Sequence, residues 1–148
     1  MATMISPVRL TIPDDYNLKN EISPFDVPKN ITAIYLAETD EFEIEFRYIS
    51  SENLRSFGNA AAKIQLGKNS YRIYSLTLAN ASKKRFCLEY SLLDVINNLM
   101  QTLSASVAER DRPLANYSTI KALVSHSSAA LEKYLDESLR ETQLQAIA

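Results

Sequence analysis

The residues most able to do chemistry lie in Glu38–Glu45, where five carboxylates fall within eight positions. Paired carboxylates can act as a general acid and base, or can hold a divalent cation. A general acid needs a pocket that raises its pKa, and a calcium loop needs a sharp glycine turn. This run has no glycine, and it alternates with Phe42, Ile44 and Phe46. The pattern favours a β-hairpin tip and its solvent-facing side over a catalytic or metal site.

Two single residues could also be reactive, Cys87 and His126. Cys87 follows the basic residues 83–85, whose charges can lower the pKa of a thiol, but no base for it can be identified. His126 has no carboxylate or cysteine three or four residues away that could orient it or complete a metal site. The sequence thus predicts no catalytic residue, no metal site and no cofactor.

The scarcity of glycine excludes two classes of nucleotide site. The chain has 2 glycines in 148 residues, Gly58 and Gly67, and neither lies in a cluster. Loops that cradle phosphate need glycine so that backbone amides can approach the anion closely. The Walker A and dinucleotide-binding fingerprints are therefore absent from this chain.

Basic and aromatic residues follow the acidic part of the chain. Residues 1–50 hold four basic and nine acidic side chains, whereas residues 51–100 hold seven and three. Basic side chains interleaved with Tyr71, Tyr74 and Phe86 are typical of surfaces that bind single-stranded nucleic acid, but the pI of about 5.5 argues against that ligand. Other anionic ligands, or an acidic protein surface, fit this pattern at least as well as nucleic acid does. The candidate anion-binding residues are Lys63, Arg72, Lys83, Lys84 and Arg85.

The spacing of apolar residues predicts the elements that hold these side chains. Over residues 31–49 apolar and polar residues alternate, which is the period of a strand. We expect a hairpin folded about residues 39–40, with Ala37 opposite Phe42 and the glutamates on the outer face. A short helix is then predicted over residues 52–57, and three more strands over residues 61–90.

Two long helices are predicted to follow Tyr90. The first has apolar residues at helical spacing from Leu92 to Val107 and ends before Pro113, which disfavours helical geometry in the preceding residue. The second is longer and runs from about Leu114, with apolar residues at helical spacing as far as Leu139. Strands followed by helices are typical of the α+β class. We therefore predict an antiparallel meander of about five strands with two long C-terminal helices packed on one face.

The length of the chain fits one domain, since a 148-residue chain can bury roughly two-thirds of its unfolded surface. Residues 1–30 hold four of the five prolines, which limit strand pairing, so we expect one short strand there, near residues 8–12. Residues 31–148 would form the single α+β domain. The lone cysteine, the lack of a secretory signal and the lack of an apolar run near ~20 residues predict a soluble cytoplasmic protein with no membrane contact.

The C-terminal helix offers the most informative surface for a functional prediction. Leu131, Leu135 and Leu139 form a stripe beside Tyr134, on a helix of about 30 residues, or about 45 Å. That length exceeds what a small sheet can cover, so part of the helix should project or pack on a partner. We expect a non-catalytic regulatory or adaptor protein that binds itself, as a homo-oligomer, or another protein through these four residues.

The sequence leaves two other functions open. One is a small-molecule binding protein or enzyme, with a pocket between sheet and helices that would be lined by Tyr35, Tyr48, Tyr71, Tyr90, Tyr117 and Tyr134. The other is weak binding of nucleic acid or another anion by the basic residues between 63 and 85.

Overall fold

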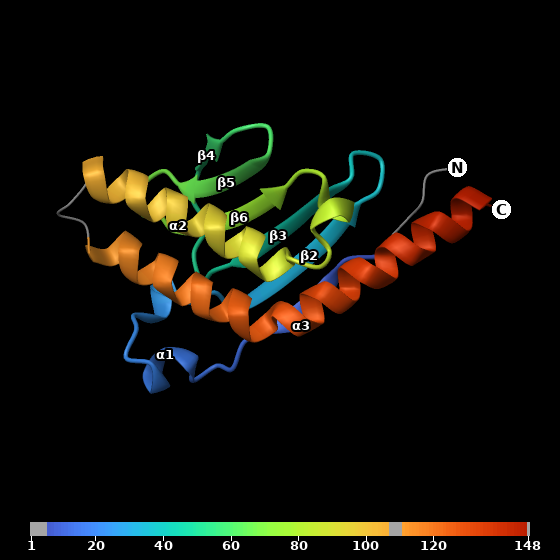
Figure 1. Ribbon diagram of the computed structural model, residues 1–148. Helices are drawn as coiled ribbons and strands as arrows, with labels where there is room; N and C mark the ends of the chain where they lie inside the picture. The colour runs from blue at the N-terminus through green and yellow to red at the C-terminus, as the bar shows by residue number, and fades with distance from the viewer. Residues whose placement is uncertain (1–5, 107–110, 148) are drawn as a thin grey trace.

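The computed structural model describes residues 6–106 and 111–147 and arranges them as a six-stranded antiparallel sheet with two long helices across one face (Figure 1). In chain order the elements are β1 (Val8–Thr11), α1 (Tyr16–Lys19), the 3-10 helix η1 (Pro24–Asp26), β2 (Asn30–Leu36), β3 (Glu41–Arg47), β4 (Leu54–Gly58), β5 (Ala62–Gly67), β6 (Ile73–Leu78), the 3-10 helix η2 (Ala81–Lys84), α2 (Leu88–Ser106) and α3 (Asp111–Ile147).

The strand order of this sheet is β1-β2-β3-β6-β5-β4, and every neighbouring pair is antiparallel. The sheet therefore consists of two consecutive three-stranded meanders, joined where β3 pairs with β6. The predicted α+β class, with an antiparallel sheet and two long C-terminal helices, is confirmed. The predicted single meander of about five strands is corrected to six strands in two meanders.

The first hairpin has the predicted faces but a different register. Phe42 pairs with Tyr35 and not with Ala37, because residues 37–40 form a four-residue turn. The register thus differs by two residues from the predicted one. Since the side-chain period of a strand is also two, a shift of this size leaves every side chain on its predicted face. Within β2 and β3 the apolar side chains of the inner face are buried, and the glutamates lie on the outer face.

Two predicted elements are wrong. Residues 52–57, predicted as a helix, contain most of β4, in which pairing with β5 outweighs the local helix signal. Gly58 ends this strand with a φ of 116°, and a Cβ there would lie 2.2 Å from the carbonyl oxygen of Ala62. Residues 85–90, predicted as a strand, contain the start of α2. Phe86 and Tyr90 are 85% and 72% exposed. The alternation of apolar and polar residues in this segment therefore does not indicate a strand that faces the core.

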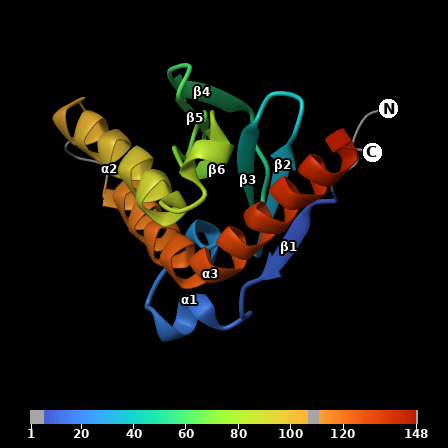
Figure 2. The same cartoon turned by 45° about the vertical axis from the view of Figure 1, so that its right-hand side comes forward.

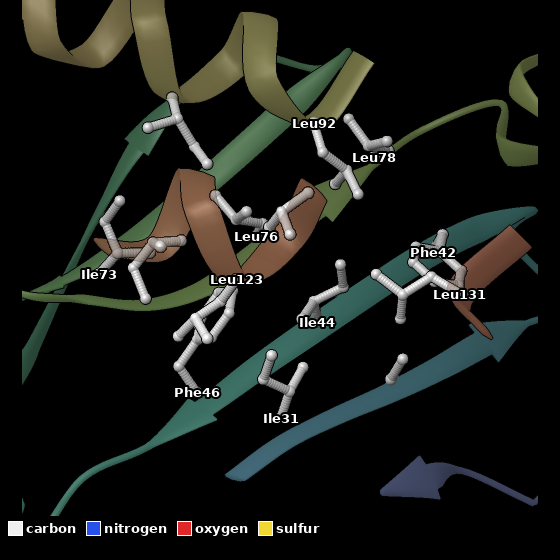
Figure 3. Close-up of a cluster of buried hydrophobic side chains, with 14 of the residues drawn as sticks. Ile31, Phe42, Ile44, Phe46, Ile73, Leu76, Leu78, Leu92, Leu123 and Leu131 are labelled. Carbon is white, nitrogen blue, oxygen red and sulfur yellow. The ribbon is translucent and has the colours of Figure 1, made fainter. Parts of the chain in front are cut away.

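The two long helices cover the inner face of the sheet (Figures 1 and 2). α3 begins at Asp111, before the predicted Leu114, so Pro113 lies in its first turn, where proline is tolerated. The predicted end of the preceding helix falls partly on residues 107–110, which lie outside the described residues. Figure 3 shows core side chains of β2, β3 and β6 gathered with Leu92 of α2 and with Leu123 and Leu131 of α3.

The N-terminal segment is part of the same sheet and core. β1 pairs with β2, and Ile12 and Val27 are buried in the hydrophobic core. The segment between them forms α1 and η1, which lie below the sheet in Figure 1. Among the described residues, no helix is both long and apolar enough to cross a bilayer.

Candidate functional site

The residues predicted to bind a partner are mostly buried in the core of the chain itself. Leu131, Leu135 and Leu139 are 1%, 0% and 7% exposed. Tyr134 is half-buried, and its ring lies 6.3 Å from that of Phe42. These three leucines therefore pack inside the chain itself. The prediction that the stripe binds a second copy or another protein gains no support from these contacts.

The hydroxyl of Tyr134 also has a role within the chain. It accepts a hydrogen bond from the backbone N–H of Tyr35 at 3.1 Å and donates one to the carbonyl of Ser6 at 3.0 Å. Val8 pairs with Ala33, so an extension of that ladder would place Ser6 opposite Tyr35. The hydroxyl thus bridges β2 to the residues before β1, where direct pairing has ended.

Arg72, one of the predicted anion-binding residues, is buried and ion-paired. Its Nε lies 3.0 Å from Oδ1 of Asp26, and its Nη1 lies 3.7 Å from Oε2 of Glu52. Its side chain is only 7% exposed. The charge of Arg72 is therefore balanced inside the fold, and this residue does not belong to an exposed basic surface.

The carboxylate of Glu52 completes this buried network. It accepts hydrogen bonds from the backbone N–H groups of Asn69 and Ser70 and from the hydroxyl of Tyr74. Burial by itself would raise the pKa of Glu52, but the hydrogen bonds from Ser70, Asn69 and Tyr74 outweigh burial and hold the pKa below its ordinary value. The network thus favours the ionised carboxylate and fixes the turn between β5 and β6.

The other predicted anion-binding residues come from separate elements. Lys63 is exposed on β5, and Lys83 and Lys84 lie in η2. Arg85 follows η2, with its guanidinium 4.4 Å from the ring centre of Phe86 and 3.8 Å from Oδ1 of Asp136. Lys63, Lys83 and Lys84 remain candidates for an exposed basic surface.

The tyrosines predicted to line a pocket are dispersed. The hydroxyls of Tyr48 and Tyr117 donate hydrogen bonds to the backbone carbonyls of Ile73 and Tyr71, and Tyr90 is exposed. Burial raises the pKa of Tyr48 and Tyr117 well above the ordinary tyrosine value, as expected for hydroxyls that serve as neutral donors in a core. Neither of the two grooves described below is lined by any of the six tyrosines.

The acidic run contains a structural carboxylate, Asp40. Its Oδ1 accepts hydrogen bonds from the Tyr35 hydroxyl at 2.7 Å and the Ser82 N–H at 3.0 Å, and its Oδ2 accepts one from Ser82 Oγ at 2.7 Å. Burial would raise the pKa of Asp40, but the hydrogen bonds from Ser82 and Tyr35 outweigh burial and lower the pKa. The carboxylate therefore ties the turn between β2 and β3 to the start of η2.

The other reactive residue types do not converge. Cys87 and His126 are both exposed, and the Cys87 sulfur has a hydroxyl of Ser91 at 3.6 Å. Glu43 lies between two other glutamates on the outer face, and burial, then Glu45, then Glu41 raise its pKa. Within the residues that the structure describes, no three His, Cys, Asp or Glu side chains are grouped so that they could hold a metal ion.

A groove that the sequence did not predict lies between the β4–β5 hairpin and α2. We call it the edge groove, and its volume is about 220 Å³. Its apolar walls come from both layers of the fold, and three polar residues stand among them. It is lined by Phe57, Gly58, Asn59, Ala62, Ile64, Val95, Asn98, Leu99 and Thr102. A second groove of about 120 Å³ lies against the N-terminal segment, with prolines and Lys29 in its lining.

The edge groove adjoins a free strand edge, because β4 is the last strand of the sheet. The carbonyl of Asn53 accepts the N–H of Lys68, and the N–H of Asn59 donates to Ala62. Backbone groups alternate in direction along a strand, so residues 53, 55, 57 and 59 face β5. The N–H and C=O groups of Leu54, Ser56 and Gly58 face outward, and no strand of the described chain pairs with them.

Comparisons of the chain with protein-family models, with curated proteins and with solved structures found no match.

Proposed function

We propose that this protein is a non-catalytic, protein-binding module of the regulatory or adaptor kind, which binds an extended segment of another protein along β4. The observation that carries the proposal is the position of the edge groove directly beside the free edge of the sheet. Extended peptides add to exposed sheet edges through main-chain hydrogen bonds, and pockets for alternate side chains provide specificity. β4 and the edge groove offer both kinds of contact.

The register of β4 supports entry of a partner's side chains into the edge groove. Phe57 pairs with Ile64, whose side chain is buried on the inner face of the sheet. A seventh strand beside β4 would place every second side chain on that same face. Those side chains would lie next to Phe57 and below α2, where Val95 and Leu99 form the opposite wall.

The size of the edge groove also favours side chains over a free small molecule. Its volume of about 220 Å³ lies below the roughly 300–1,000 Å³ that is common for small-molecule sites.

The leucine stripe of α3, which was predicted to bind a partner, packs in the core, so we place the partner surface at β4. Edge strands are usually short or charged, which limits uncontrolled pairing with other chains. β4 is short, with five residues, but Arg55 is its only charged residue.

The test uses Ser56, whose N–H faces outward. Peptides are selected from a random heptapeptide display library on the purified protein, and their affinities are measured for wild type, Ser56→Pro and Ser56→Ala. Proline at this position removes one outward donor and no bond to β5. We expect Ser56→Pro to weaken binding about tenfold or more, from a lost hydrogen bond and steric conflict, and Ser56→Ala to change it little.

Two results would contradict the proposal. Selected peptides could bind Ser56→Pro as tightly as wild type, which would place their site away from β4. The library could also yield no peptide that shifts the backbone amide resonances of residues 54–58 in NMR spectra. Far-ultraviolet circular dichroism of both variants checks that β4 and the rest of the sheet remain folded.

A further inference from the structure

We infer that the segment bound along β4 is acidic as well as apolar; this inference rests on the proposed function. It follows from the distribution of charge around the edge groove. From Asn53 to Leu88 the chain has seven basic side chains and no aspartate or glutamate. The part of the sheet that would receive the partner is thus basic, although the whole chain has a formal charge of −2.

Two of these seven basic residues are already balanced by carboxylates elsewhere in the fold. Arg72 is paired with Asp26 and Glu52, and Arg85 with Asp136. Arg55, Lys63 and Lys68 are exposed, and no carboxylate of the described residues lies within ion-pair distance of them. These three charges, which we call the edge cations, are available to a partner.

The edge cations border β4 along its length. Arg55 lies on β4 itself, with its guanidinium 5.0 Å from the ring centre of Phe57, on the groove side of the sheet. Lys63 is paired in register with Gly58 at one end of the strand. Lys68 donates its backbone N–H to Asn53 at the other end. A segment along β4 would therefore pass a lysine at each end and Arg55 on the strand, with Lys63 on the opposite face of the sheet from Arg55.

The same charges disfavour a second copy of this chain as the occupant. Pairing of β4 with the β4 of another copy would bring two sets of edge cations together, with no carboxylate from residues 53–88 of either copy to balance them. Like charges across adjacent strands are destabilising. A partner whose carboxylates alternate with apolar residues meets both requirements, because its apolar side chains fill the edge groove and its carboxylates lie on the opposite face, which is the face of Lys63.

The test compares three synthetic heptapeptides with the same apolar positions. They alternate valine with glutamate, with glutamine or with lysine, and fluorescence anisotropy measures their affinity at 50 and 300 mM salt. We expect the glutamate peptide to bind at least tenfold more tightly than the glutamine peptide at low salt, and the lysine peptide to bind most weakly. The advantage should shrink at 300 mM salt, because the charges are then screened over a shorter distance.

Variants assign the effect to the edge cations. The triple variant Arg55→Gln, Lys63→Gln and Lys68→Gln should remove most of the preference for glutamate. Lys133→Gln, an exposed cation on α3, is the matched control and should leave the preference unchanged. Sedimentation of the protein alone adds a check, since pairing of β4 between copies predicts a dimer that Ser56→Pro dissociates, and such a dimer would overturn the inference.

The outcomes separate this inference from the proposed function. If the three peptides bind with equal affinity and Ser56→Pro weakens all of them, the partner segment is not selected for acidity, but strand addition at β4 stands. If none of the three binds and the display peptides are also indifferent to Ser56→Pro, the proposed function fails and this inference fails with it.

Discussion

The side chain of Asn116 joins three parts of the fold. Its Nδ2 donates hydrogen bonds to the carbonyl of Asp26 at 2.7 Å and to the hydroxyl of Tyr48 at 3.0 Å. Its Oδ1 accepts the backbone N–H of Ile73 at 2.9 Å. Asn116 is fully buried on α3, so its replacement would remove all three hydrogen bonds in a setting where water cannot easily restore them.

We therefore expect Asn116→Ala to lower the free energy of unfolding by about 3 kcal/mol, since three buried hydrogen bonds would be lost. Urea denaturation followed by circular dichroism measures the change. Ser118→Ala, at an exposed position two residues further along α3, should cost less than about 0.5 kcal/mol. Equal losses in the two variants would show that the Asn116 network contributes little to stability.

Asp40 should make stability depend on pH in the acid range. Its folded-state pKa is lowered, so its contribution is fully present above the unfolded value of about 3.9 and is lost as the pH falls through the folded value. At pH 7 we expect Asp40→Ala to cost about 1 kcal/mol, as for loss of a capping side chain. Thermal unfolding at pH 7 and at pH 2.5 measures the difference, which should be smaller at the lower pH.

Glu38→Ala provides the control for Asp40, because Glu38 is exposed in the same turn and no hydrogen bond of its side chain is found among the described residues. It should change the melting temperature little at either pH. A loss for Asp40→Ala that is just as large at pH 2.5 would mean that packing, and not the ionised carboxylate, holds the turn to η2.

The first hairpin and β4 show how far strands and helices can be predicted from this sequence. The faces of the first hairpin follow from an alternation that repeats over the whole of β2 and β3, so they were predictable. Its register depends on the length of the turn, which the alternation does not determine. β4 was not predictable because its five residues form a strand only through pairing with β5.

The leucine stripe of α3 raises a related problem. Its spacing predicts a helix with an apolar face, which the structure confirms, but the same spacing cannot distinguish a face that packs on its own sheet from one that binds a partner. The edge groove was hidden for a similar reason. Its two walls come from β4–β5 and α2, and the prediction of a helix at residues 52–57 left no strand edge there.

Tyr134 attaches the second half of α3 to β2 and to Ser6, two residues before β1. Its hydroxyl is the only described group that links Tyr35 N–H to the carbonyl of Ser6. We expect Tyr134→Phe to lower the free energy of unfolding by about 1–2 kcal/mol and to speed hydrogen exchange at the Tyr35 amide. Tyr90→Phe, at an exposed position, should have neither effect. Unchanged exchange at Tyr35 would rule out the bridging role.

The molecule as a whole has two different sheet edges. The β1 edge is accompanied by the second half of α3 (Figure 2), and the Tyr134 hydroxyl bridges it to β2. The β4 edge has an adjacent groove and outward backbone groups without a strand beside them in the described chain. The edge groove beside β4 favours this edge for partner addition, and Ser56→Pro tests that contact.

The hydrogen bonds of Asn116 also bear on how the chain is made. Its partners Ile73, Tyr48 and Asp26 lie 43, 68 and 90 residues earlier in the sequence. Every strand is therefore translated before the residue that joins these segments. Contacts so distant in sequence form slowly, so a nascent chain that lacks α3 exposes part of the inner face of the sheet until α3 has been made. That interval is when the chain is most open to a chaperone or to aggregation.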